Sequence, residues 1–304
     1  MIILSQKKAI FLFSYFIFLF IAFPSLAQDI EEGEKLYKAN CTACHQIDAK
    51  LIGPALRGVS EKYSQEWLIK WIKNYTNTIK TQPVSLVIGV SGGVDSALTS
   101  TLCAHTGLNT IAISMPIKQN SSQHELSLRH LEFLKKNFDN VDTRVIKLDE
   151  IFKTFESTMK DYDSELAFAN SRSRLRMVTL YQVAQSNNGI VVGTGNKVED
   201  FGVGFYTKYG DGGVDISPIA DCTKTEVWEL ARELRILEDI IDAAPTDGLW
   251  DDSRNDENQL GLSYKQLEEA MENKNSQYFK KYEEIRGPNL HKMKPIPVCE
   301  FPRD

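Results

Sequence analysis

The chain has 304 residues, of which 42% are hydrophobic and 25% are charged, and its formal net charge is −6. This composition is typical of a globular protein with one large domain and room for a small second one, and it excludes a disordered or collagen-like chain. The acidic balance argues against a protein that holds nucleic acid through a basic surface, because neutralising phosphates supplies non-specific affinity. We therefore expect small-molecule ligands and no nucleic acid.

The first 27 residues have the pattern of an export signal. Lys7 and Lys8 precede an apolar run over residues 9–23, and small residues then lead to Gln28 at the spacing that a signal peptidase accepts. The run is shorter than the ~20 residues that cross a bilayer comfortably. A cleaved signal peptide over residues 1–27 is therefore favoured over an uncleaved anchor, and it points to the periplasm or the membrane. We expect membrane contact only through this segment.

Residues 28–66 carry a haem-attachment motif. Cys41 and Cys44 are followed directly by His45, which is the CxxCH pattern in which two thiols bind the haem covalently and the histidine is the proximal ligand. With the Gly-Pro-Ala-Leu loop that follows, this segment resembles a class I c-type cytochrome, and the resemblance implies haem c on these three residues. No methionine occurs between the histidine and Met115 to serve as the second axial ligand, so we expect a truncated, small helical cytochrome c fragment. A chance motif or a zinc half-site is the alternative.

Beyond residue 84, short apolar runs alternate with amphipathic segments. We expect strands at residues 84–90, 109–115, 143–148 and 189–193, and helices at residues 97–105, 123–138 and 164–185. Strands separated by helices of this length predict an α/β fold with a doubly wound parallel sheet. Ligands bind such a sheet at the carboxyl ends of its strands.

The first expected strand ends in a glycine-rich loop, SGGVDS, at residues 91–96. Its glycines let backbone N–H groups surround an anion, and the helix that follows adds its positive end. The loop has no lysine and is not a Walker A motif. It resembles instead the loop of the ATP pyrophosphatase superfamily, with its adenine nucleotide alpha hydrolase-like fold. The resemblance implies ATP contacts at Gly89, Ser91, Gly92, Gly93, Val94, Asp95 and Ser96.

Three further stretches of sequence indicate one family within this superfamily. They are NSRSRLRM at residues 170–177, GTGNKVED at residues 193–200 and FYTKYGDGGVD at residues 205–215. With these, residues 67–304 resemble the ammonia-dependent NAD synthetases. On the helix expected over the first stretch, Arg172 and Arg176 share a face, whereas Arg174 points elsewhere.

The resemblance assigns roles to individual residues. It implies deamido-NAD contacts at Arg174, Lys208, Asp215, His291 and Lys292. It implies further ATP contacts at Thr194, Lys224 and Thr246, and Mg²⁺ on Asp95 and Glu199. The acidic, turn-rich residues 244–261 have the length and composition of a functional loop.

The activity that this resemblance implies is an ATP-dependent amidation. Ammonia converts deamido-NAD to NAD through an adenylated intermediate, with release of AMP and pyrophosphate, and Asp95, Glu199 and Lys224 are the expected catalytic residues. ATP is then a co-substrate, Mg²⁺ the cofactor and a homodimer the expected state.

The two resemblances predict different compartments for the chain. An exported cytochrome belongs outside the cytoplasm, whereas a synthetase belongs with its nucleotides. The segment at residues 66–75 suits either parent, since both families carry a tryptophan-rich amphipathic helix there. Three hypotheses follow: a working synthetase behind a vestigial fusion, an exported haem electron-transfer protein with a passenger domain, and a fusion that folds where no ATP exists. The first is favoured because its motif set is complete.

Overall fold

The computed structural model describes residues 64–79, 84–119, 121–246, 248–249 and 255–299. All of them belong to one compact unit, which begins at Tyr63. The predictions of a signal peptide and of haem ligation by Cys41, Cys44 and His45 lie outside the described residues. Within the described part of the chain, no helix is both long and apolar enough to cross a bilayer.

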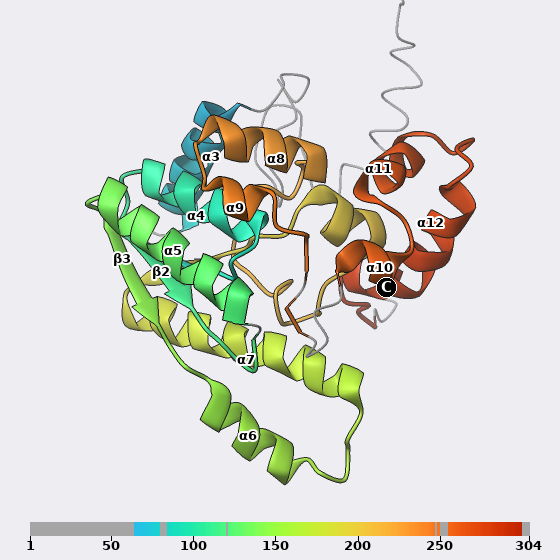
Figure 1. Cartoon of the computed structure of the whole chain (residues 1–304), viewed down its shortest axis with the longest axis horizontal. Coiled ribbons are helices and arrows are strands. Elements are labelled where there is room, and N and C mark those ends of the chain that lie inside the picture. The colour runs from blue at the N-terminus through green and yellow to red at the C-terminus, as the bar shows by residue number, and fades with distance from the viewer. Residues whose placement is uncertain (1–63, 80–83, 120, 247, 250–254, 300–304) are drawn as a thin grey trace, which may run out of the picture. The chain divides into compact units, whose positions relative to one another are not determined.

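Four parallel strands form the central sheet (Figure 1). They are β1 (Ser85–Gly89), β2 (Thr110–Ser114), β3 (Val141–Val145) and β4 (Gly189–Val192), in the spatial order β3-β2-β1-β4. The chain runs outward from β1 to β3 and then crosses back to place β4 on the other side of β1. This order confirms the doubly wound prediction, and it places the ligand-binding crevice at the carboxyl ends of β1 and β4.

Helices cover both faces of the sheet. One face carries α3 (Gln65–Ile79), α4 (Val94–His105), α5 (Ser121–Asn137), α8 (Lys224–Glu233) and α9 (Glu238–Ile241), and the other carries α6 (Asp149–Thr158) and α7 (Glu165–Ser186). Successive residues of β1 alternate between them: Leu86 and Ile88 pack into the first core, and Val87 packs into the second. Because both faces are buried, the central strands are continuously apolar, which is why their sequence pattern was readable.

The remaining helices form a C-terminal lobe beside the sheet (Figure 1). They are the π-helix η1 (Lys197–Val203), α10 (Asp256–Leu260), α11 (Tyr264–Glu272), α12 (Phe279–Arg286), the 3-10 helix η2 (Gly287–Asn289) and α13 (Leu290–Met293). A separate small core holds this lobe together, with Val203, Leu267 and Tyr282 among its buried side chains. Since η1 directly follows β4 and its loop, the lobe is anchored at the carboxyl edge of the sheet.

The third strand lies two to three residues earlier than predicted. Its expected range was residues 143–148, whereas β3 is Val141–Val145. β3 pairs only with β2 and is therefore an edge strand, on which Asp142 and Arg144 point to solvent and pair with each other. The apolar residues that suggested the strand lie partly beyond its end. α6 was not predicted, although two acidic residues in its first turn are a helix-start signal; it buries only Phe152 completely.

The helix that suits both parent families, α3, belongs to the core of this fold. Leu68 and Ile72 are 1% and 0% exposed, and they pack in the same core as α4 and α8. The two positions are four residues apart, so they lie on one face of the helix. The synthetase-like unit therefore uses the apolar face of α3.

A buried histidine, His130, lies on α5 and contacts α4. The His130 Nε2 atom lies 2.9 Å from the Ser100 hydroxyl of α4, and the imidazole stacks on Phe133. The residue is 0% exposed, and burial lowers its pKa to about 4. His130 is therefore neutral in the folded protein at neutral pH.

We expect this histidine to weaken the fold in acid. Its pKa in the unfolded chain is about 6.5, so its neutral form supports the fold above that pH, and the support is lost as the pH falls towards the folded value. Between pH 7 and pH 4 the free energy of unfolding should fall by about 3 kcal/mol more in the wild type than in His130→Gln. Urea unfolding measured across this range tests the difference, and parallel curves for the two proteins would contradict it.

Candidate active site

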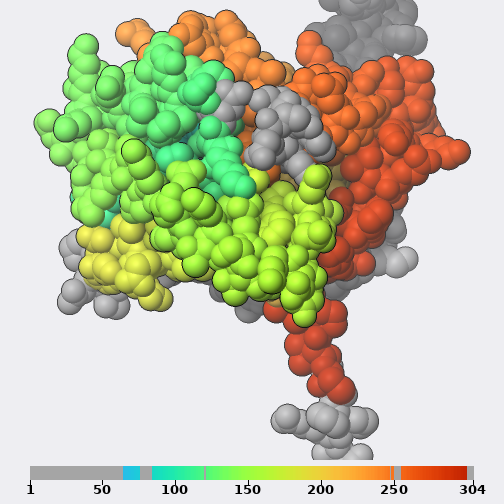
Figure 2. Space-filling view, turned by 60° about the horizontal axis from the view of Figure 1, so that its bottom comes forward, coloured from blue at the N-terminus to red at the C-terminus, as the bar shows by residue number. Residues whose placement is uncertain are grey.

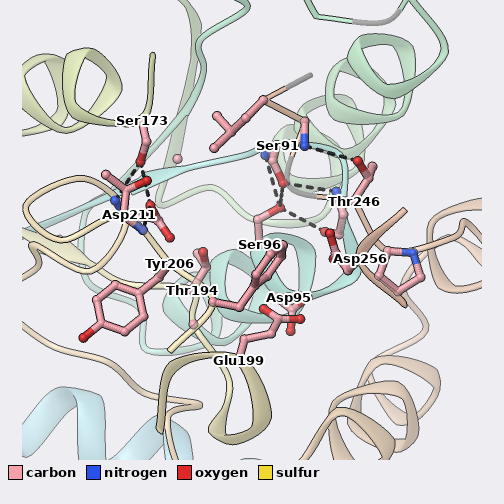
Figure 3. Close-up of a pocket in the computed structure, with 18 of the residues that line it drawn as sticks. Ser91, Asp95, Ser96, Ser173, Thr194, Glu199, Tyr206, Asp211, Thr246 and Asp256 are labelled. Carbon is pink, nitrogen blue, oxygen red and sulfur yellow. Dashed lines mark hydrogen bonds between the residues drawn. The ribbon is translucent and has the colours of Figure 1, made fainter. Parts of the chain in front are cut away.

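A cavity of about 650 Å³ opens at the carboxyl ends of β1 and β4. Residues from the loop after β1, the loop after β4, α5, α7 and the C-terminal lobe line it. Figure 3 shows Ser91 and Ser96 at one side, Ser173 and Asp211 at the other, and Asp95 next to Glu199. The cavity therefore lies where a doubly wound sheet binds its ligands.

The loop after β1 forms a tight glycine cradle at the start of α4. Gly92 has φ +97°, and a Cβ there would lie 2.3 Å from the carbonyl oxygen of Gln123, so only glycine fits. The Ser91 N–H donates to the Ser96 hydroxyl (3.1 Å), and the Gly93 N–H donates to the Ser91 hydroxyl (3.2 Å). No side chain caps the N-terminus of α4 at Gly93. The positive end of α4 can therefore meet an anion in the cavity.

Three charged residues meet beside this cradle. The Lys224 Nζ atom lies 2.6 Å from Asp95 Oδ2 and 2.9 Å from Glu199 Oε1. The residues come from α8, α4 and η1, and Lys224 is only 1% exposed. Burial by itself would lower the pKa of Lys224, but the two carboxylates raise it above its ordinary value. The lysine therefore stays charged and holds the two acids together; we call these three residues the carboxylate–lysine group.

Asn196 sets the geometry of this group. Its side-chain oxygen caps η1 by accepting from the N–H groups of Val198 (3.0 Å) and Glu199 (3.1 Å), and its Nδ2 atom donates to Asp95 Oδ1 (2.9 Å). Asn196 is 0% exposed, so these hydrogen bonds are shielded from water. One buried amide therefore ties the loop after β4 to the first turn of α4.

The two carboxyl groups differ in acidity. Burial raises the pKa of Asp95, with a further contribution from the negative charge of Glu199, although Lys224 opposes both. Burial also acts to raise the pKa of Glu199, but Lys224 and the hydroxyl of Tyr264 outweigh it and hold the pKa below its ordinary value. Glu199 is therefore the more firmly ionised of the pair.

Two further carboxylates, Asp200 and Asp211, line the cavity and form what we call the acidic wall. Asp211 accepts from the Ser173 hydroxyl (2.6 Å) and from the N–H of Thr207 (3.0 Å). The Asp200 carboxylate packs against Gly195, where a Cβ would lie 1.9 Å from its Oδ2 atom. Desolvation by the surrounding protein raises the pKa of both acids. A cation placed beside these two acids would favour their ionised forms.

All ten residues expected to contact ATP line the cavity. Its lining contains Gly89, Ser91, Gly92, Gly93, Val94, Asp95, Ser96, Thr194, Glu199, Lys224 and Thr246, together with Lys292. The Lys292 Nζ atom donates to the carbonyl of Tyr206 (2.8 Å) and lies 5.1 Å from the centre of that ring. Burial lowers the pKa of Lys292.

The other residues expected to contact deamido-NAD lie outside the described lining. Arg174, Lys208 and His291 form a chain of contacts, in which Arg174 Nε donates to the Lys208 carbonyl (3.3 Å) and Lys208 Nζ donates to the His291 carbonyl (3.2 Å). Asp215 accepts from the N–H of Val191 (2.7 Å) and from the hydroxyl of Tyr181 (3.1 Å). Asp215 therefore supports the end of β4 in this structure.

The arginines of α7 face as their spacing predicts. Arg172 is buried and donates to the carbonyl of Leu249, Arg176 lines the cavity and donates to the carbonyl of Met115, and Arg174 is exposed. Arg176 is thus the α7 arginine that reaches the cavity, and the sequence analysis gave it no role.

Further residues of the site were also assigned no role from sequence. Asn196 and Asp211 stood inside the quoted motifs, and an asparagine placed three residues before Glu199 is a helix-capping signal that could have been used. Asp256 and Tyr264 come from the C-terminal lobe, far along the chain from Glu199. Asp256 lies in the segment 244–261 that was expected to be a functional loop, whereas no local pattern marks Tyr264, because only the packing of the lobe brings it to the site.

Two family models match the chain. The NAD synthase model covers residues 65–299, and the Cytochrome c model covers residues 30–88, so the two overlap at residues 65–88. The second match supports the predicted fusion with a cytochrome c segment.

Proteins of known name are similar over the same region. The NH(3)-dependent NAD(+) synthetase of Carboxydothermus hydrogenoformans is 39% identical over 68% of this chain and 83% of its own length. That of Finegoldia magna is 34% identical over 78% and 96%. Among solved structures, the NMN synthetase of Francisella tularensis has a TM-score of 0.71 and 29% identity, over 79% of this chain and 100% of its own. The NH3-dependent NAD synthetase of Campylobacter jejuni has a TM-score of 0.62 and 25% identity, over 78% and 97%. The chain therefore belongs to the NAD synthase family.

Proposed function

We propose that this chain amidates deamido-NAD with ammonia at the expense of ATP, giving NAD, AMP and pyrophosphate. The observation that carries the proposal is the carboxylate–lysine group beside the glycine cradle, in a chain of the NAD synthase family. The uncapped first turn of α4, at the end of the cradle, offers N–H donors to phosphate oxygens, and Lys224 offers a buried positive charge. These features suit a reaction whose leaving group is pyrophosphate.

The reaction has two steps. In the first, a nicotinate carboxylate oxygen attacks the α-phosphorus of ATP, the bond from that phosphorus to the bridging oxygen of the β-phosphate breaks, and pyrophosphate leaves into the cradle beside Lys224. In the second, ammonia attacks the carbonyl carbon of the mixed anhydride and AMP departs with the bonding electrons of the broken C–O bond. Charge neutralisation and positioning supply most of the catalysis.

The acidic wall fits the nitrogen donor. Ammonia exists mainly as ammonium at neutral pH and must lose a proton before it can attack. A carboxylate whose pKa lies above its ordinary value, as at Asp211, attracts the cation and accepts its proton more readily than a fully hydrated one. We assign ammonium binding to this side of the cavity.

The carboxylate–lysine group also fits a magnesium ion. Asp95 and Glu199 converge on one nitrogen atom and offer hard oxygen ligands. In the part of the chain that the structure describes, no three acidic, histidine or cysteine side chains form a metal cluster. Mg²⁺ is commonly bound by one or two carboxylates and by substrate phosphates, so two are sufficient. When bound, the ion would neutralise phosphate charge.

A second candidate substrate is the mononucleotide. The Francisella tularensis structure, with a TM-score of 0.71, is an NMN synthetase. The same two steps applied to nicotinate mononucleotide would give NMN, because the reacting carboxylate is identical. Competition between the two substrates, with NAD and NMN quantified by chromatography, distinguishes the activities.

We propose a homodimer formed through α6 and α7. Exposed apolar side chains line these helices, among them Ile151 and Phe155 on α6 and Leu166 and Val178 on α7. The yellow-green surface in Figure 2 belongs to this part of the chain. Sedimentation equilibrium tests the proposal, and a mass equal to one chain would reject it.

We propose that the synthetase acts in the cytoplasm, where its nucleotides are, and that haem attachment at Cys41 and Cys44 requires export. The two activities then belong to different populations of the chain. Cell fractionation tests this, with haem staining and a synthetase assay on each fraction. Haem and NAD formation in the same fraction would contradict the separation.

Removing either acid of the carboxylate–lysine group should abolish turnover. Asp95→Asn and Glu199→Gln each remove a negative charge while preserving shape, so we expect kcat to fall by at least about 10²-fold with the fold retained. The assay follows AMP and NAD release at saturating Mg²⁺, with Asp142→Asn on the edge strand as the control. A wild-type rate in either variant would remove that acid from the catalytic group.

Replacing the lysine should expose the two acids to each other. In Lys224→Met, Asp95 and Glu199 lose their cation, and we expect the free energy of unfolding to fall by about 3–5 kcal/mol. Millimolar Mg²⁺ should restore part of this loss, because the ion supplies the missing charge. The control is Lys197→Met, whose partner Asp221 is exposed (2.9 Å), and it should lose less than about 1 kcal/mol. No stabilisation of Lys224→Met by Mg²⁺ in urea unfolding would contradict the metal fit.

A further inference from the structure

One buried tyrosine of the C-terminal lobe reaches the carboxylate–lysine group. Tyr264, the first residue of α11, is 1% exposed, and its hydroxyl lies 2.6 Å from Glu199 Oε1 and 3.1 Å from Asp256 Oδ2. The Lys224 Nζ atom lies 4.9 Å from the centre of the ring. The tyrosine therefore contacts two members of the group from outside the sheet.

The Tyr264 hydroxyl can donate only one hydrogen bond. A phenol has one proton to donate, and two carboxylates lie within reach. The shorter distance, 2.6 Å, is to Glu199, and it falls in the range of a charge-assisted O–H···O⁻ hydrogen bond. We therefore assign the donated proton to Glu199.

The hydrogen bond also selects one oxygen of Glu199. Tyr264 and Lys224 both donate to Oε1, so Oε2 accepts from neither of them. With Oε1 held by two donors, the carboxylate is fixed in one orientation, and its second oxygen has a defined direction relative to Asp95. A metal site made of only two protein carboxylates depends on that direction.

The lobe holds Tyr264 rigidly enough for this role. Ser263 and Gln266 form a capping box at the start of α11, and the Tyr264 N–H donates to Glu257 Oε1 (3.0 Å). One turn later, Glu268 accepts from the N–H and the hydroxyl of Thr225 (2.9 and 2.7 Å), next to Lys224 on α8. α11 thus fixes both Glu199 and the start of the helix that carries Lys224.

We propose that Tyr264 is a positioning residue for the divalent cation, acting through Glu199. This rests on the proposed function only in that the cation is the one that accompanies ATP. The hydroxyl orients Glu199, and Glu199 with Asp95 then holds the ion at the phosphates.

The test compares metal binding and turnover in the full chain. Tyr264→Phe keeps the ring, its edge-to-face packing on Trp228 and its contact with Lys224, and removes only the hydroxyl. Mn²⁺ affinity in the presence of ATP is measured by electron paramagnetic resonance, and turnover is measured as a function of Mg²⁺ concentration. Because a hydrogen bond to a charged group is lost, we expect Mn²⁺ affinity to fall about tenfold or more and the Mg²⁺ concentration for half-maximal rate to rise by the same factor. KM for deamido-NAD should change less than about twofold, since uniform substrate binding is untouched.

The matched control is Tyr282→Phe. Tyr282 is also buried, and its hydroxyl donates to the carbonyl of Gly202 (3.1 Å), away from the cavity. This variant should keep wild-type Mn²⁺ affinity, and any general loss of stability would appear in its melting temperature as well.

A double variant tests whether Tyr264 acts through Glu199 or independently of it. If Tyr264 acts through Glu199, then adding Tyr264→Phe to Glu199→Gln lowers Mn²⁺ affinity no further, whereas independent effects would add. Wild-type Mn²⁺ affinity in Tyr264→Phe, an additive double variant, or a wild type that binds no Mn²⁺ with ATP would each overturn the proposal. A wild type that binds Mn²⁺ but forms no NAD would instead reject the proposed function and leave the positioning role supported by the affinity difference.

Discussion

The site depends on the buried, positively charged side chain of Lys224. Lys224 lies between Asp95 and Glu199, which come from helices more than a hundred residues apart in the chain. Two carboxylates this close would repel each other strongly in a water-poor interior, and burying either without a partner is unfavourable. The cation therefore joins α4, η1 and α8 at one point. The loops after β1 and β4 face each other because these elements do.

The surrounding polar network extends that constraint outward. Asn196 caps η1 and binds Asp95, while Tyr264 and Glu268 connect the group to α11. The bonds from Asn196 to Asp95, from Tyr264 to Glu199 and from Thr225 to Glu268 each join two different elements, so they constrain how these elements are arranged. The C-terminal lobe thus helps to position the residues of the site.

Three of the four strands were predicted from the sequence close to their positions in the structure, for physical reasons. β1, β2 and β4 are buried on both faces and appear as unbroken apolar runs, and the glycine loop marks the end of β1. β3 was misplaced because an edge strand needs only one apolar side. The glycine loop, Asp95 and Glu199 stand in motifs that follow strands, and Lys224 was named through the family resemblance, but the ion pairs of Lys224 with both acids were not predicted. Tyr264 could not be found this way, since its contact with Glu199 spans 65 residues and arises from packing between the lobe and the sheet. Haem attachment and the domain boundaries remain predictions from the sequence.

Helix α3 sets a limit on how this chain can be shared between two families. Both family models include its residues, yet the helix has one apolar face, and Leu68 and Ile72 on that face are already enclosed by the sheet domain. Withdrawing a large aliphatic side chain from a packed core costs about 2–5 kcal/mol for each residue, so a second fold could recruit the helix only by opposing that free energy. Any other fold that needed the same face of α3 would therefore have to compete with the packing of Leu68 and Ile72 in the sheet domain.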